Sequence, residues 1–273
     1  MHITKMHGLG NDFIVIEERE LTGSDVTALA RTLCARRLNV GADGLLLVDK
    51  SDHADVRMRI INSDGSEAEM CGNGIRCFAR YVYDKGIVKK AQMDVETLAG
   101  VIRPELVIEN GKVSAVRVDM GKPSFDPQAI PVLAQDPMDF EIETAHGAVR
   151  ASSVLMGVPH TIVFVEDMEA VPIEALGREI ETHALFPRRT NVDFIQVLNE
   201  NTARMETWER GAGRTLACGT GATAAGVVMY KKGIMGPQAD IRLFAGTLHI
   251  DNLPDGRAMM TGAAEYVFDG ETK

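Results

Sequence analysis

The chain carries one segment twice: CGNGIRCFARYVYDKGI (71–87) returns as CGTGATAAGVVMYKKGI (218–234). Seven of the 17 aligned positions are identical, namely the cysteine, both glycines of Gly-x-Gly, a tyrosine, a lysine and the closing Gly-Ile. A second pair, LAGVI (98–102) and FAGTL (244–248), lies at nearly the same separation, and a polar turn follows each copy. We therefore predict two structural halves with one plan, divided near residue 118.

Both copies have the pattern of a helix that begins at its cysteine. After Cys71 the apolar residues follow helical spacing, and Gly86 is placed to end the helix. The copy that begins at Cys218 has almost no polar face, which predicts a helix buried on all sides. Two further helices are predicted around 24–37 and 172–184.

The segments around these helices alternate in the manner of half-buried strands. They are short, rich in β-branched residues and bounded by Gly, Pro or Asp, as in DVRMRIINSDG, KVSAVRVDMG, DFEIETAHG, SSVLMG and HTIVFVED. The pattern predicts an α+β fold. Each half is expected to be an antiparallel, barrel-like sheet wrapped around a central helix, with the active-site cleft between the halves.

Composition limits the function classes. The 273 residues carry a formal charge of −10, which argues against a nucleic-acid partner because phosphate binding needs a basic surface. The sequence has neither a membrane-spanning apolar run nor a signal peptide, so a cytoplasmic protein with reduced thiols is expected. Its four cysteines form neither a disulfide framework nor a C-x2-C pair, so no metal site is expected.

The two repeated cysteines are the candidate reactive groups. A thiol at a helix start meets unpaired N–H groups and the positive end of the helix dipole, which favour the thiolate and form an anion site. Cys34 and Cys77 are expected to be small buried hydrophobic residues instead. Two thiols, one protonated and one not, suit the inversion of a carbon stereocentre, in which one proton leaves and another arrives on the opposite face. No lysine lies in a pyridoxal phosphate context, so no cofactor is expected.

A competing interpretation is a nucleotide site. The stretch GTGATA (219–224) fits the G-x-G-x-x-A fingerprint of dinucleotide-binding folds. That fingerprint requires a buried strand before it, whereas WERGAGRTLAC (208–218) is polar and broken by glycine. The acidic residue downstream, Asp240, precedes a strand rather than ending one. The context therefore disfavours a dinucleotide.

Taken together, the chain closely resembles the diaminopimelate epimerase family over essentially its full length. The marks are KMHGLGNDF (5–13), NSDGSEAEMCGNGIRCFARYV (62–82), NVDFIQV (191–197) and WERGAGRTLACGTGATA (208–224). The resemblance implies a cofactor-independent isomerase that converts LL- to meso-diaminopimelate, a precursor of lysine and peptidoglycan. It also implies that the C-terminus returns to the first half, giving domains 1–118 plus 263–273 and 119–262.

The resemblance also assigns residues. Cys71 and Cys218 would be the acid/base pair, and His160 and Glu209 would adjust their pKa values. The substrate α-carboxylate would meet the helix starts at Gly72, Asn73, Gly219 and Thr220. The remaining groups would meet Asn11, Asn62, Asn191, Glu209 and Arg210, with Arg210 as the bidentate partner of the distal carboxylate. Tyr266 would help to form a homodimer.

Each of these residues has an ordinary alternative. Without the resemblance, Asn11 and Asn62 have the pattern of turn residues, and His160 that of a core histidine. The Glu209–Arg210 dipeptide would be a solvated surface pair.

Two positions depart from the family pattern. Val158 stands where members commonly carry Asn, and Gly44 stands where some carry Gln. The loss of these amides leaves open a racemase for another amino acid. A third alternative is a non-catalytic amino-acid binder that kept the fold.

Overall fold

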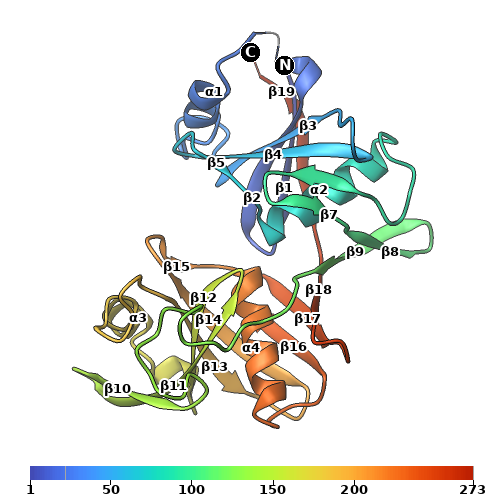
Figure 1. Ribbon diagram of the computed structural model, residues 1–273. Coiled ribbons are helices and arrows are strands. Elements are labelled where there is room, and N and C mark those ends of the chain that lie inside the picture. Colours follow the sequence, from blue (N-terminus) through green and yellow to red (C-terminus); the bar gives the residue numbers. More distant parts are fainter. Residues whose placement is uncertain (22, 273) are drawn as a thin grey trace. The chain divides into compact units, whose positions relative to one another are not determined.

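The computed structural model describes residues 1–21 and 23–272 (Figure 1). The chain forms two compact units. Unit 1 comprises Met1–Val118 and the segment that starts at Thr261, and unit 2 comprises Asp119–Met260. The chain passes from one unit to the other within strand β9 (Lys112–Asp119) and back within strand β18 (Ala258–Gly262).

Unit 1 is a mixed sheet packed on helix α2. Its strands run in the order β19-β1-β2-β3-β4-β6-β7, with β5 beside β4. The bounds are β1 His2–Gly8, β2 Asn11–Glu17, 3-10 helix η1 Glu18–Glu20, α1 Val26–Leu33, β3 Gly44–Asp49, β4 Val56–Asn62, β5 Glu67–Ala68, α2 Gly72–Asp84, β6 Val95–Thr97, β7 Gly100–Ile102, β8 Glu105–Glu109 and β19 Glu265–Glu271. Helix α2 buries Ile75, Phe78 and Val82 against β1 to β4.

Unit 2 has the same kind of architecture around helix α4. The second sheet runs β10-β11-β12-β13-β14-β16-β17-β18-β9-β8, with β15 beside β14. The bounds are β10 Phe140–Thr144, β11 Gly147–Met156, β12 Val158–Phe164, 3-10 helix η2 Met168–Ala170, α3 Ile173–Glu181, β13 Asn191–Val197, β14 Thr202–Glu209, β15 Gly213–Thr215, α4 Gly219–Lys231, β16 Gln238–Leu243 and β17 Gly246–Asn252.

The two units share one order of elements. The series β2-α1-β3-β4-β5-α2-β6-β7 corresponds to β12-α3-β13-β14-β15-α4-β16-β17. The repeat seen in the sequence therefore extends to strands whose sequences do not match. The predicted α+β class is correct.

The expectation of antiparallel sheets is wrong in one respect, since both sheets are mixed. The pairs β2–β3, β4–β6, β12–β13 and β14–β16 are parallel. Among the described residues, the chain between the two strands of each pair contains one α-helix, which is α1, α2, α3 or α4 respectively. Parallel neighbours need a long crossover, usually a helix, because the chain must return to the same end of the sheet. Each parallel pair thus has the crossover helix that it needs.

The helices themselves lie where the sequence predicts them. The ranges 24–37 and 172–184 contain α1 and α3, and α2 and α4 begin directly after Cys71 and Cys218. The glycines that close the two copies, Gly86 and Gly233, have φ of 71° and 69°. This left-handed conformation favours glycine and ends a helix.

Helix α4 is buried on nearly every side, as its apolar sequence predicts. It packs against β11, β12, β13, β16 and β17, and its residues from Gly221 to Met229 are all buried (Figure 1). The close approach depends on small residues: a Cβ atom at Gly226 would lie 2.8 Å from the Ile250 side chain. The first residue of α4 is therefore held in a fixed place within unit 2.

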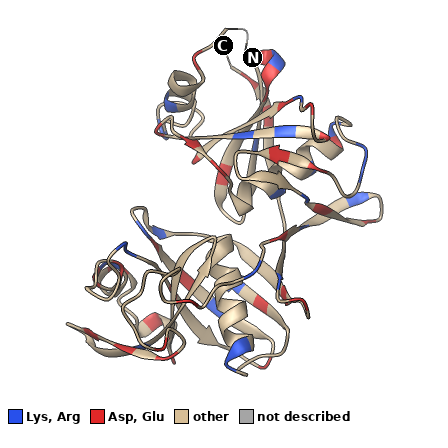
Figure 2. Cartoon of the chain, viewed as in Figure 1, with Lys and Arg blue, Asp and Glu red and all other residues tan. Residues whose placement is uncertain are grey.

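Charges of both signs are interspersed along the elements of each unit (Figure 2). Within residues 1–21 and 23–272, no helix is long and apolar enough to cross a membrane. The same described residues contain no group of three or more His, Cys, Asp or Glu side chains arranged to hold a metal ion.

Candidate functional site

Cys71 is the N-cap residue of α2. Its backbone is extended, with φ −145° and ψ 120°, and its Sγ accepts a hydrogen bond from the Gly74 N–H at 3.4 Å. The cysteine thus replaces the usual Ser, Thr or Asp side chain that satisfies a free N–H at a helix start. The interaction between the sulfur and the helix start, expected from the sequence, is present.

A series of hydrogen bonds through two side-chain amides passes beside the Cys71 sulfur. The Asn11 Oδ1 lies 3.6 Å from Cys71 Sγ and accepts from Asn73 Nδ2 at 3.1 Å. The other end of the Asn11 amide donates to Asp43 Oδ2 at 2.6 Å. Asn73 Oδ1 accepts from the guanidinium of Arg76, which is fully buried. Because Arg76 can only donate and a carboxylate can only accept, both amide orientations are determined.

The position of Asn11 follows from a tight turn. Leu9 and Gly10, which join β1 to β2, both have positive φ, at 59° and 93°. Asn11 is the first residue of β2, and Asp12 beside it binds Lys5 at 2.7 Å and Arg36 at 2.5 Å. The turn and this ion-pair network hold Asn11 over the start of α2.

Asn62 and Gly44 are opposite each other in the β3–β4 pair. The Asn62 side chain donates to Ser66 Oγ at 3.0 Å within the turn after β4, which is the turn role it would have without the resemblance. A Cβ atom at Gly44 would lie 2.8 Å from the Ile61 carbonyl oxygen. In this chain the two strands are therefore too close at that point for a larger residue unless the backbone shifts.

Cys218 is the N-cap residue of α4, in the place that Cys71 has in unit 1, but its surroundings differ. Its backbone is extended, yet its sulfur makes no capping hydrogen bond and lies 3.4 Å from Thr220 Oγ1 instead. We expected the helix start to lower the thiol pKa. For Cys218 that expectation is wrong: burial, and then the carboxylates of Glu209 and Asp193, raise its pKa well above the ordinary value.

His160 and Glu209 both belong to the surroundings of this thiol. His160 Nε2 is 3.0 Å from Thr220 Oγ1, and its Nδ1 is 2.7 Å from Asp193 Oδ2. Glu209 accepts from the Thr215 hydroxyl at 2.5 Å and interacts with Cys218, and burial raises the pKa of its carboxyl group. Unit 2 thus brings both predicted pKa-modulating residues to its thiol.

Asn191 forms two hydrogen bonds within unit 2. Its side chain is buried and ties two backbones together: Nδ2 donates to the Pro159 carbonyl at 2.8 Å, and Oδ1 accepts from the Arg210 N–H at 2.9 Å. The Arg210 guanidinium is exposed and donates to the Arg188 carbonyl at 3.1 Å. Asn191 therefore positions Arg210 through its backbone.

The remaining predicted residues are placed as follows. Gly72 and Gly219 are the first residues of α2 and α4, and Thr220 is the second residue of α4. Val158 begins β12 and is 37% exposed. Tyr266 lies on β19 under the Arg80 guanidinium, 5.2 Å from the ring centre, and burial raises the pKa of its hydroxyl.

Asp193 is a residue that the sequence analysis missed. It lies in the middle of β13 between Val192 and Phe194, and it is fully buried. A charged residue between two apolar neighbours of a strand was the available signal, because a buried carboxylate needs specific partners. Asp43 and Arg76, at the two ends of the amide chain in unit 1, were also missed.

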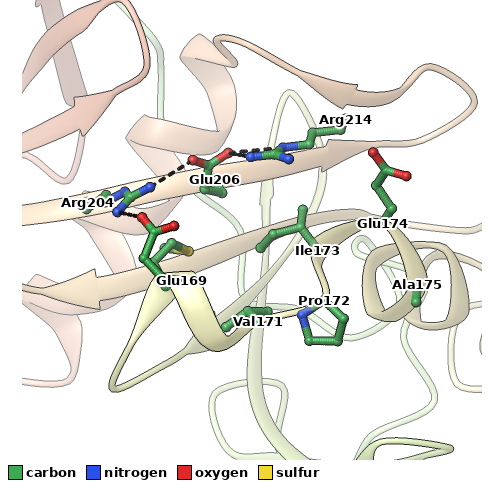
Figure 3. Close-up of a pocket in the computed structure, with 10 residues that line it drawn as sticks. Glu169, Val171, Pro172, Ile173, Glu174, Ala175, Arg204, Glu206 and Arg214 are labelled. Carbon is green, nitrogen blue, oxygen red and sulfur yellow. Dashed lines mark hydrogen bonds and ion pairs between the residues drawn. The ribbon is translucent and has the colours of Figure 1, made fainter.

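Unit 2 also has a cavity that neither Cys218 nor its partners line (Figure 3). It has a volume of about 400 Å³ and is lined by η2, the start of α3 and charged residues of β14 and β15. Arg204 binds Glu169 at 2.6 Å, and Arg214 binds Glu206 at 3.0 Å. These charges satisfy one another, and none of the predicted site residues lines the cavity. It is not the candidate site.

A family model and the curated relatives that match the sequence point to one family. A family model described as diaminopimelate epimerase matches residues 3–125 and 152–267. The chain is 50% identical over 275 residues to the diaminopimelate epimerase of Moorella thermoacetica, with 99% of each chain covered. It is 51% identical over 273 residues to the diaminopimelate epimerase of Caldanaerobacter subterraneus subsp. tengcongensis, again with 99% of each covered.

Solved structures share the fold at low identity. A phenazine biosynthesis protein of the PhzF family from Bacillus anthracis matches with a TM-score of 0.72 at 15% identity, over 100% of this chain and 99% of that one. A hydroxyproline epimerase from Agrobacterium vitis matches with a TM-score of 0.69 at 18% identity, over 99% and 91%. At such identities the likeness concerns the fold alone.

Proposed function

We propose that this chain, which belongs to the diaminopimelate epimerase family, converts LL-diaminopimelate to meso-diaminopimelate by exchanging protons between two cysteines and the substrate. The observation that carries the proposal is the equivalence of Cys71 and Cys218. Each is the N-cap residue of the helix at the same place in the shared order of elements, and each sulfur lies among polar side chains. Two equivalent thiols can act on the two faces of one carbon atom, one thiol on each face.

In the proposed mechanism, one sulfur removes the α-proton while the other delivers a proton to the opposite face. The raised pKa of Cys218 keeps it protonated near neutral pH, so it is the proton donor in the free protein. Cys71, whose sulfur accepts the Gly74 N–H, is then the base. The roles reverse when the other epimer binds. The mechanism requires both sulfurs to reach opposite faces of one α-carbon.

The negative charge that develops during proton removal needs donors fixed in advance. The first two residues of each helix are Gly72 and Asn73 in α2 and Gly219 and Thr220 in α4. We assign the α-carboxylate to these helix starts, because the N-terminus of a helix favours an anion. Such donors stabilise the transition state because they need no reorganisation. No cofactor has a step in this route.

The distal half of the substrate is assigned to Arg210. Its guanidinium is exposed, and Asn191 holds its backbone N–H in place. Guanidinium groups bind carboxylates through two parallel hydrogen bonds. We assign Asn11 and Asn62 to the amino groups of the substrate and Glu209 to the Cys218 thiol.

Membership of the family also suggests a pathway, a compartment and an oligomeric state for this protein. The reaction would serve lysine and peptidoglycan precursor synthesis in the cytoplasm, where the four free cysteines stay reduced. We further propose a homodimer formed through β19. That strand contains Tyr266, lies at the edge of the unit 1 sheet and exposes Val267 and Phe268, so it offers a sheet edge and apolar area to a second copy.

The experiment is α-proton exchange in deuterated water. LL-diaminopimelate should gain deuterium at the inverted α-carbon, and Cys71→Ala and Cys218→Ala should each lower the rate at least about a thousandfold, within the usual range for acid–base groups. Cys34→Ala is the control, since Cys34 is a buried cysteine at the end of α1. Exchange that survives either catalytic substitution, or a wild-type chain inert toward this substrate, would contradict the proposal.

A racemase for another amino acid is the second candidate. It is supported by Val158, a partly exposed apolar residue, and by Gly44, whose surroundings leave no room for an amide side chain. In that case an amino acid without a distal carboxylate should exchange its α-proton faster than LL-diaminopimelate does. The same assay on a panel of amino acids decides between the two.

A further inference from the structure

Four side chains of unit 2 form an unbroken series that ends at the Cys218 sulfur. Asp193 Oδ2 lies 2.7 Å from His160 Nδ1, and His160 Nε2 lies 3.0 Å from Thr220 Oγ1. Thr220 Oγ1 in turn lies 3.4 Å from Cys218 Sγ. Asp193 and His160 are fully buried, and Cys218 is 5% exposed.

The chemistry of the groups fixes the direction of these bonds. An ionised carboxylate only accepts, so the proton between Asp193 and His160 belongs to Nδ1. In a neutral imidazole Nε2 then has no proton and must accept one from the Thr220 hydroxyl. The lone pairs of the Thr220 oxygen are left to accept the S–H of Cys218. Each link after Asp193 can therefore both give and receive a proton.

We propose that Asp193 is a positioning residue that holds His160 as the Nδ1–H tautomer, so that Cys218 can pass its proton through Thr220 to His160. The S–H bond of Cys218 breaks and its proton bonds to the Thr220 oxygen. The proton that Thr220 carried moves to His160 Nε2. The products are a thiolate and an imidazolium, and the Asp193 carboxylate balances the new positive charge. The inference rests on the proposed function, because it gives Cys218 an acid/base role.

Three neighbouring strands hold the Asp193 end of this series. His160 comes from β12, Asp193 from β13 and Thr207 from β14, where Thr207 is the direct partner of Asp193. The Thr207 hydroxyl donates to Asp193 Oδ1 at 2.7 Å, so both oxygens of the buried carboxylate are satisfied. A partner for each oxygen is what makes a buried carboxylate tolerable.

The helix is adapted to the same carboxylate. A Cβ atom at Gly221 would lie 2.5 Å from Asp193 Oδ1, so only glycine lets the first turn of α4 approach this closely. The positive end of a helix dipole favours the negative charge placed there. The glycine at position 221 thus indicates, independently of the hydrogen bonds, that the start of α4 is shaped to accommodate the Asp193 carboxylate.

The series in unit 1 differs in one respect that matters. The Cys71 sulfur contacts Asn11, which leads to Asp43, and an amide does not take up a proton. Cys218 therefore has an internal proton acceptor along its series, whereas the amide series of Cys71 offers none. The charged groups that face Cys218 are Glu209 on β14 and Asp193 on β13, so Glu209 is the rival acceptor.

The first test is nitrogen NMR of the histidine side chains in the full chain, with the His160 signals identified by their loss in His160→Gln. At neutral pH the expected result is a neutral ring protonated at Nδ1. A ring protonated at Nε2 would overturn the proposal. This readout needs no substrate, so it remains informative even if the chain does not act on diaminopimelate.

The second test compares Thr220→Val with Thr220→Ser. Valine keeps the shape and removes the hydroxyl, so kcat for α-proton exchange should fall about a hundredfold, within the range for one proton-transfer group. Serine restores the hydroxyl and should stay within about threefold of wild type. Wild-type kcat in Thr220→Val would overturn the relay and leave Glu209 as the acceptor. If Thr220→Val does not fold, the serine variant and the NMR result decide.

Discussion

His160 Nδ1 and Asp193 Oδ2 lie 2.7 Å apart, and both side chains are completely buried. A carboxylate without water around it is costly, so its two oxygens must find donors within the protein. Here one donor is the imidazole and the other is the Thr207 hydroxyl. The hydrogen bond between His160 and Asp193 therefore serves two purposes. It satisfies a buried carboxylate of unit 2, and it orients the imidazole that we assign to the Cys218 thiol.

Gly221→Ala tests the space that this carboxylate occupies. The added Cβ would lie 2.5 Å from Asp193 Oδ1, so the helix or the carboxylate must shift. The expected result is a loss of about 1–3 kcal/mol in the free energy of unfolding, measured by urea denaturation. Gly236→Ala is the matched control, because a Cβ there meets nothing within 4 Å. Equal stability of the two variants would contradict the geometry.

Arg210→Ala tests the distal carboxylate. A hydrogen bond to a charged group contributes about 1.5–3 kcal/mol, so KM for LL-diaminopimelate should rise roughly ten- to hundredfold with a smaller change in kcat. Arg188→Ala is the control, since it keeps the backbone carbonyl that accepts from Arg210 and removes an exposed side chain. If KM is unchanged in Arg210→Ala, another residue binds the distal carboxylate.

Asp43→Ala tests the amide series beside Cys71. Without the carboxylate, Asn11 Nδ2 loses its acceptor and its amide is free to turn away from the sulfur. The rate of α-proton exchange should fall about tenfold, the equivalent of one hydrogen bond of about 1.4 kcal/mol. Asp43→Asn keeps one acceptor oxygen and should recover most of the rate.

The control for Asp43 is Glu67→Ala, which removes a carboxylate of unit 1 that pairs with Arg59. It should leave the exchange rate at the wild-type level. An Asp43→Asn variant as slow as Asp43→Ala would mean that the charge of Asp43, rather than its acceptor oxygen, is what the site needs.

Cys77→Ala tests the effect of burial on a thiol. Cys77 is fully buried, and burial raises its pKa from 9.0 to about 12. Between these values the unfolded chain releases a proton that the folded chain keeps. Stability from this group is therefore complete below pH 9 and is lost as pH rises toward 12.

The measurement is urea denaturation at pH 8 and pH 10.5 for wild type and Cys77→Ala. The stability advantage of wild type should shrink by about 2 kcal/mol between the two pH values, at 1.36 kcal/mol per pKa unit. The cavity left by alanine costs the same at both pH values, so it does not contribute to the change. The other alkaline titrations occur in both chains and cancel in the difference between them. A constant difference would show that the Cys77 pKa is not raised.

The sequence predicted the elements better than their pairing. Helical spacing and closing glycines placed α2 and α4, because these signals act over a few neighbouring residues. The same reasoning gave antiparallel sheets, whereas β2–β3 and three further pairs are parallel. Strand direction depends on which segments meet after a crossover, and that is not a local property.

The candidate residues divide in the same way. The two cysteines and the residues after them were visible as a repeat, and their N-cap positions follow from the helix starts. The turn bond of Asn62 was visible as an alternative, because its partner Ser66 is four residues away. The bonds of Asn191 were not visible, because the Pro159 carbonyl and the Arg210 N–H are far from it in the sequence. The pKa of Cys218 was predicted in the wrong direction, because burial outweighs the helix start.

By itself, the sequence determined that the chain has two halves of one plan, each with a cysteine at the start of a buried helix. Periodicity and glycine positions suffice for this, since each depends on residues close together in the chain. Only the tertiary structure decided that Asp193 supports His160 and that Thr220 joins His160 to Cys218. These contacts join residues on separate strands and a helix, and desolvation depends on everything packed around them.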